Sequence, residues 1–73
     1  MKFYSRYGKR CRYKFGDIVT ILNEVSYNEY IVINANWIGN SNGFWEIELE
    51  HTKTHQRIKR LRPMLKKVGE INE

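Results

Sequence analysis

The sequence predicts an all-β fold in a single small domain of 73 residues. Apolar and polar residues alternate with a period of two in most segments, and clusters of Gly, Asn and Ser separate these segments. Helical periodicity is poor along the whole chain. The length leaves no room for a second domain, and the 41% apolar and 14% aromatic content favours a packed core over disorder.

The first predicted strand is 10–15, whose core-facing side holds Cys11, Tyr13 and Phe15. A β-branched run predicts the second strand at 18–22. Because Cys11 alternates inward, we expect a buried and unreactive thiol. A lone cysteine cannot form an internal disulfide, and it fits a reducing, cytoplasmic location.

The third predicted strand is 30–38, which follows a polar turn. A period of two along it places Ile31, Ile33, Ala35 and Trp37 on one face. We interpret this tryptophan as a core residue rather than as a platform for stacking.

The clearest turn of the chain is Gly-Asn-Ser-Asn-Gly at 39–43, where glycine allows positive φ and Asn and Ser can bond nearby backbone. The strand that follows, 44–51, alternates strictly between apolar and acidic residues. Its tryptophan is also interpreted as core. The two faces hold Trp45, Ile47 and Leu49 on one side, and Glu46, Glu48 and Glu50 on the other.

The last part of the chain predicts a turn at 52–55 and a short strand at 56–61. Pro63 ends this strand, and 62–66 can form one helical turn before a final short strand near Val68.

The strand candidates on either side of the 52–55 turn match one antiparallel register, in which apolar and charged pairs agree. Two bases are thereby assigned to cross-strand pairs rather than to ligand contacts. The pairs are Leu49 with Ile58 on the core side, and Glu50 with Arg57 and Glu48 with Lys59 on the solvent side.

Four or five short strands are too few for a two-layer sandwich, so we expect a small bent barrel that hides its edges. The stretch Tyr-Lys-Phe-Gly-Asp-Ile-Val-Thr-Ile, at 13–21, resembles the opening strand of SH3-like barrels, including KOW- and Tudor-type modules. Arg-Ile-Lys-Arg-Leu-Arg-Pro-Met-Leu, at 57–65, is similar to their fourth strand, 3-10 turn and fifth strand. The resemblance spans about 13–68. It implies a five-stranded SH3-like barrel whose first and last strands are neighbours.

This fold divides the chain into a flexible basic and aromatic arm at 1–9, a barrel at 10–69 and a tail at 70–73. All 13 Lys and Arg residues lie in two blocks, 2–14 and 53–67, which contain no acidic residue. The segment between the blocks has six acidic residues and no base. Because barrel closure brings the blocks together, the net charge of +5 becomes one basic face, which attracts a polyanion.

Lys and Arg bind phosphate, and aromatic rings stack on unpaired bases. The combination of basic and aromatic residues in this chain therefore fits nucleic acid as a ligand. The same charges also fit a merely solvated surface. The candidate contacts are Arg6, Lys9, Arg10, Arg12 and Lys14 in the first block, Arg60, Arg62, Lys66 and Lys67 in the second, and the tyrosines Tyr4, Tyr7, Tyr27 and Tyr30.

Two functions follow from this pattern. The first is a nucleic-acid-binding module that holds the DNA or RNA backbone with weak sequence specificity. The alternative is a protein-binding module that uses the basic face against an acidic surface, such as a phage or mobile-element factor docking on a host complex. The Asn-, Ile- and Lys-rich composition indicates an AT-rich genome, as in some bacteria and their phages.

The sequence predicts no enzyme, cofactor or metal site. No serine lies in a nucleophile turn and no glycine-rich phosphate loop is present. His51 and His55 lie across a turn and lack further ligands for zinc, so we interpret them as ordinary loop histidines. No apolar run of membrane-spanning length is present, and a monomer is compatible with the sequence.

Overall fold

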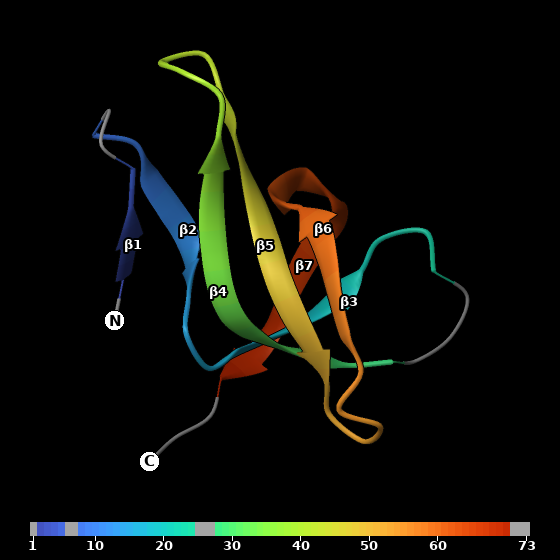
Figure 1. Cartoon of the computed structure of the whole chain (residues 1–73). Helices are drawn as coiled ribbons and strands as arrows, with labels where there is room; N and C mark the ends of the chain where they lie inside the picture. The colour runs from blue at the N-terminus through green and yellow to red at the C-terminus, as the bar shows by residue number, and fades with distance from the viewer. Residues whose placement is uncertain (1, 6–7, 25–27, 71–73) are drawn as a thin grey trace.

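The structure is a computed structural model that describes residues 2–5, 8–24 and 28–70. These residues form strands joined by short turns, together with one 3-10 turn, as Figure 1 shows. In chain order the elements are β1 (Lys2–Tyr4), β2 (Arg10–Lys14), β3 (Asp17–Ile21), β4 (Tyr30–Ile38), β5 (Phe44–His51), β6 (Arg57–Leu61), η1 (Arg62–Met64) and β7 (Leu65–Glu70).

Five strands form an antiparallel sheet in the order β6-β5-β4-β3-β7, and β1 pairs with β2 in a separate hairpin. In Figure 1 this hairpin lies alongside β4, and the long strands β4 and β5 curve across the molecule. The all-β prediction is confirmed, and so is the 3-10 turn before the last strand. In the described part of the chain the sheet is not closed, because β6 and β7 form its two edges.

The core lies between β2 and the inner face of the sheet. The Tyr13 hydroxyl donates to the Leu65 carbonyl oxygen at 2.9 Å, which ties β2 to β7. Cys11 is only 2% exposed, and burial raises the pKa of its thiol, so the expected buried thiol is confirmed. The buried apolar residues are Cys11, Tyr13, Val19, Tyr30, Val32, Trp45, Ile47, Leu49 and Leu65.

The expectation that Ile31, Ile33, Ala35 and Trp37 share a face is wrong. The register between β4 and β5 shifts at a β-bulge after Val32. An extra residue at a bulge moves the following side chains to the other face. Val32 therefore faces the core before the bulge, whereas Ala35 and Trp37 pack against the core after it.

Phe15 also departs from its expected inward position, since its side chain is 57% exposed. Strand β2 ends at Lys14, and Phe15 lies in the turn that follows. Gly16 continues this turn with a φ of 93°, and its N–H donates to the Val32 carbonyl oxygen at 2.9 Å. Alternation stops where the strand stops, so Phe15 is directed to solvent.

The expected flexible arm at the N-terminus is corrected in part, because β1 pairs with β2 and Phe3 packs against the core. Two backbone bonds shape the connection between these strands: Ser5 N–H donates to the Lys9 carbonyl oxygen at 2.9 Å, and Gly8 N–H donates to that of Ser5 at 3.1 Å. Strand pairing and the packing of Phe3 therefore hold β1 against the rest of the fold.

The β5–β6 hairpin has the register expected from the sequence. Leu49 opposes Ile58, and Glu50 opposes Arg57, whose Nε donates to Glu50 Oε1 at 3.2 Å. Glu48 opposes Lys59 in the same register, but no ion pair within 4 Å joins these two described side chains.

His51 organises the turn of this hairpin. Its Nδ1 accepts the backbone N–H groups of Lys53 and Thr54, both at 3.1 Å, so its Nε2 is left to donate to Asn28 Oδ1 at 3.0 Å. Its ring also packs edge-on against Tyr30. Both ring nitrogens thus have structural partners, and His51 is the last residue of β5 rather than a loop residue.

Candidate polyanion-binding cleft

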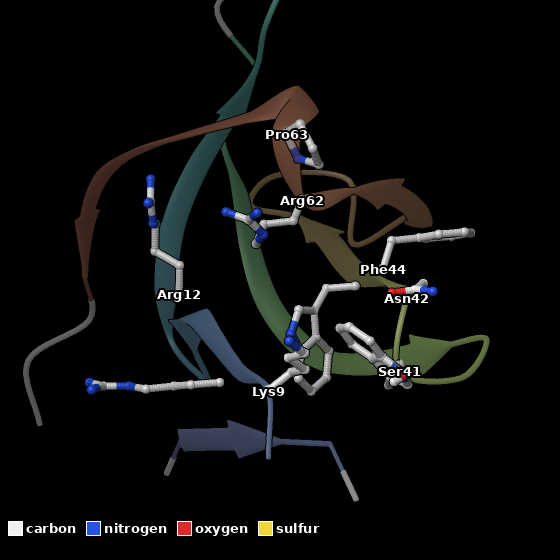
Figure 2. A pocket seen from close by; sticks show the side chains of 11 residues that line it. Lys9, Arg12, Ser41, Asn42, Phe44, Arg62 and Pro63 are labelled. Carbon is white, nitrogen blue, oxygen red and sulfur yellow. The ribbon is translucent and has the colours of Figure 1, made fainter. Parts of the chain in front are cut away.

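A cleft of about 520 Å³ opens beside the β4–β5 loop. The start of β2, the end of β4, the beginning of β5 and η1 meet there. Figure 2 shows Arg12 at one end of it, Asn42 and Phe44 at the other, and Arg62 between them with its guanidinium group directed toward Arg12. We call it the cationic cleft, and its lining residues are Lys9, Arg10, Arg12, Trp37, Ser41, Asn42, Gly43, Phe44, Trp45, Arg62 and Pro63.

Four of the lining residues are cations, and none is acidic. Lys9, Arg10 and Arg12 are exposed, and Arg62 is half-buried. Among the residues that the structure describes, none of these four side chains forms an ion pair. The cleft therefore gathers positive charge without internal neutralisation, and it draws on both basic blocks of the chain.

The alternation of β2 positions the cations of the first block. Cys11 and Tyr13 occupy the core side of this strand, so Arg10 and Arg12 point outward. Burial raises the pKa of the Tyr13 hydroxyl, and the charges of Arg12 and Arg62 act in the opposite direction. Both guanidinium groups therefore lie within electrostatic reach of the same residue.

The 3-10 turn positions the cation of the second block. Pro63 follows Arg62 in η1 and fixes the backbone of the turn, and the N–H of Leu65 donates to the Arg62 carbonyl oxygen. A second backbone bond, from Leu22 N–H to the Met64 carbonyl oxygen at 2.8 Å, fastens this turn to the end of β3. Arg62 is thus presented by a tethered element rather than by a free loop.

Aromatic rings form another part of the cleft. Trp37 and Trp45 are cross-strand partners whose rings meet edge-on, with centroids 5.4 Å apart. Trp37 Nε1 donates to the Asn40 carbonyl oxygen at 2.9 Å, which fixes the orientation of its ring. Trp45 belongs to the core, and its Nε1 has no hydrogen-bond partner in the described residues. Phe44 is 48% exposed.

The β4–β5 loop closes tightly beside these rings. Gly39 has a φ of 102°, and Gly43 N–H donates to the Asn40 carbonyl oxygen at 2.9 Å. Asn40 Oδ1 also accepts the backbone N–H of Asn42 at 3.1 Å. The exposed side chains of Ser41 and Asn42 are left at the cleft, where they can donate and accept hydrogen bonds.

Lys66 and Lys67 lie outside the cleft, in a neighbouring hollow of about 340 Å³. Arg12 lines both the hollow and the cleft. The basic surface therefore continues from the cationic cleft past Arg12 toward β7.

Lys14 and Lys67 are engaged in ion pairs. The pairing of β3 with β7 sets Asp17, which is 1% exposed, opposite Glu70. Lys67 Nζ lies 3.4 Å from Asp17 Oδ1 and 3.7 Å from Glu70 Oε2. Lys14 Nζ lies 2.9 Å from Glu70 Oε2, and this bond lowers the pKa of Glu70. Both lysines thus offset two facing carboxylates.

The remaining predicted contacts lie elsewhere. Arg60 opposes Ile47, does not line the cleft, and donates from Nη1 to the Lys59 carbonyl oxygen at 2.8 Å. Tyr30 is 7% exposed, so its ring has little surface for stacking. Arg6, Tyr7 and Tyr27, and the side chain of Tyr4, lie outside the described residues.

Sequence reasoning placed Trp37 and Trp45 in the core and did not select Phe44, Ser41 or Asn42 as contacts. The signal that could have found them is the position of the tryptophans on either side of the glycine-rich turn. In an antiparallel hairpin such residues face each other, and both then lie beside the loop.

No protein-family model matches the chain, and neither the curated proteins nor the solved structures include a match. Within the described ranges, no helix is long and apolar enough to span a bilayer. The same ranges contain no group of three or more His, Cys, Asp or Glu residues that could hold a metal ion.

Proposed function

We propose that this chain is a non-catalytic module that binds nucleic acid through the cationic cleft. The observation that supports this function best is the cleft itself, where cations from both ends of the chain meet and no carboxylate lines the wall. Unneutralised cations in a concave surface raise the local positive potential and attract a polyanion.

Nucleic acid fits this cleft better than a small anion does, because the cleft combines two kinds of contact. Arg12 and Arg62 provide guanidinium groups that can hold phosphate oxygens. Trp37 and Phe44 add aromatic surface, which is the complement of a base. The neighbouring hollow with Lys66 continues the positive surface, as a chain of phosphates requires.

We expect weak sequence specificity. Phosphate contacts position a protein on nucleic acid but do not read its sequence. No helix of the described residues could enter a major groove, and the polar side chains of the cleft are limited to Ser41 and Asn42 beside the cations.

The proposal is tested by fluorescence polarization with labelled single-stranded RNA, single-stranded DNA and duplex DNA at two salt concentrations. We expect a Kd below about 10 µM at low salt for at least one of these probes, because even non-specific binders reach about 10⁻⁴–10⁻⁶ M at physiological salt. The double variant Arg12→Glu/Arg62→Glu should abolish this binding.

The matched control is Lys53→Glu/Lys59→Glu, which changes the net charge equally but alters two exposed cations that do not line the cleft. This control should retain most of the affinity. Absence of binding to all three probes at low salt would refute the proposed function, and equal losses in the two double variants would refute the assignment to the cleft.

A protein-binding function is the second candidate, and it is favoured by the open edge strand β6. Leu61 of this edge strand is 41% exposed and Phe44 of the neighbouring β5 is 48% exposed, and an extended peptide could add to the edge as a further strand. Pulldown from a nuclease-treated lysate with the wild type and with Leu61→Asp discriminates the two functions. A partner that is lost with Leu61→Asp but kept with Arg12→Glu/Arg62→Glu would support this second function.

We also infer that the fold is an opened variant of an SH3-like barrel. The sequential order of β3 to β6 with β7 returning beside β3, together with the 3-10 turn before β7, supports this inference. The motif resemblance at 13–21 and 57–65 agrees with it.

A further inference from the structure

We infer that the cationic cleft binds a single strand, and that it takes one unpaired nucleotide with its base against Trp37 and Phe44 and the phosphates on its two sides at Arg12 and Arg62. This inference rests on the proposed function and specifies its ligand. It concerns a feature that RNA and single-stranded DNA share, namely an unstacked base joined to a flexible backbone.

The shape of the cleft favours a single strand. Its volume of about 520 Å³ lies within the range of about 300–1,000 Å³ that is typical of pockets for small molecules and cofactors. A duplex is a stiff rod with a persistence length of about 50 nm, and its bases are already paired and stacked. A single strand can bend into a concave site and turn one base toward the wall.

The aromatic groups are placed to receive that base. Trp37 is held by its bond to the Asn40 carbonyl oxygen and by its edge-on contact with Trp45, so its ring is oriented before a ligand arrives. Phe44, from the adjacent end of β5, adds an exposed ring at the same cleft. A preorganised ring such as that of Trp37 loses little conformational entropy on binding.

The polar groups are placed for the rest of the nucleotide. Arg12 and Arg62 belong to different elements, and Figure 2 shows the guanidinium group of Arg62 directed toward the end of the cleft that Arg12 occupies, with Asn42 and Phe44 at the other end. The side chain of Asn42 can donate to and accept from a base edge. The two arginines thus lie toward one end of the site, and Asn42 lies at the other.

The chain contains an intrinsic probe for this site, because its two tryptophans, Trp37 and Trp45, both line the cleft. The experiment titrates the full chain with unlabelled oligothymidine, oligouridine and a duplex DNA at low salt and follows tryptophan fluorescence. The same titrations are repeated by polarization with labelled probes, which report binding at any surface.

We expect both single strands to quench the tryptophan fluorescence and to bind more tightly than the duplex. Phe44→Leu and Trp37→Leu should each weaken single-strand binding between about fivefold and 150-fold, the range for loss of one base–aromatic stack. Phe44→Tyr should restore it. The matched control is Phe15→Leu, since Phe15 is 57% exposed and lies outside the cleft. Thermal unfolding of each variant confirms that it is folded.

The outcomes separate this inference from the proposed function. Duplex that binds as tightly as the single strands, with unchanged fluorescence and no effect of Phe44→Leu, would overturn the inference and leave nucleic-acid binding intact. No binding of any probe by polarization would refute both. A preference for oligouridine over oligothymidine, or the reverse, would identify RNA or DNA as the source of the single strand and support the inference.

Discussion

Replacing Arg12 and Arg62 by glutamine should halve the salt dependence of single-strand binding. For single strands, log K falls by about 0.7 per tenfold rise in salt for each phosphate that a cation neutralises. The four cations of the cleft therefore predict a slope of about −2.8, and Arg12→Gln/Arg62→Gln leaves two of them and a slope of about −1.4. Between 50 and 200 mM salt, the affinity should fall about 50-fold for the wild type and about sevenfold for the variant.

The assay is a polarization titration with one labelled single strand at four or more salt concentrations. Lys53→Gln/Lys59→Gln serves as the control, because it removes the same charge away from the cleft. Its slope should stay at the wild-type value. A cleft variant with the wild-type slope, or a control variant with the smaller slope, would refute the assignment of the phosphate contacts.

Three further predictions concern the stability of the domain. The bond with Lys14 holds the pKa of Glu70 in the folded protein below 4.5, its ordinary value. The ionised Glu70 therefore stabilises the fold above pH 4.5, and this stabilisation is lost as the pH falls through the lowered pKa of the folded protein. Glu70→Gln should therefore reduce the loss of stability on acidification from pH 6 to pH 3, measured by urea unfolding, and an unchanged loss would contradict this. Ile47 is fully buried, so Ile47→Val should lower the free energy of unfolding by about 0.5–1.5 kcal/mol in the same assay, and no change would argue against its core position. A Cβ atom at Gly43 would collide with the Ile38 carbonyl oxygen, so Gly43→Ala should destabilise the domain by more than about 1 kcal/mol, and a thermal midpoint equal to that of the wild type would contradict the turn geometry.

Local patterns in the sequence were enough to predict the strands from β2 onward and one hairpin register, but not β1. The strict alternation in β5 reflects one buried and one solvent face, so it predicts both strand type and partner pairs such as Leu49 with Ile58. The side of the sheet on which Ile33 lies could not be predicted. It depends on a bulge, and the bulge arises from the pairing of β4 with β5 rather than from the sequence of either strand alone. The inward position expected for Phe15 was wrong for a similar reason, because the turn at Gly16 determines where β2 ends.

The charge blocks led to the hypothesis of a polyanionic ligand and included all four cations that line the cleft, but they did not predict how the other cations are used. Lys14 and Lys67 are held by Glu70 and Asp17, which face each other only because β3 and β7 are neighbours. Such long-range pairing is invisible to a reading of local segments. Arg60 likewise lies away from the cleft because the pairing of β6 with β5 sets it opposite Ile47.

The aromatic part of the cleft was missed because burial and ligand contact were treated as alternatives. Trp37 packs against the core and also lines the cleft, so a core assignment does not exclude a functional surface. Phe44 follows the turn on the exposed side of β5, where sequence alone gives no reason for an exposed ring. A strand end beside a tight glycine-rich loop is therefore a position to consider for ligand contact.

The most direct test of the cleft is an amide and indole NMR titration of the ¹⁵N-labelled chain with a short single strand. We predict that the largest shifts occur in the backbone of 9–12, 41–45 and 62–64 and in the indole N–H resonances of Trp37 and Trp45. Shifts that concentrate instead on 57–61, or around Phe15, with both indole resonances unmoved, would contradict single-strand binding in the cationic cleft.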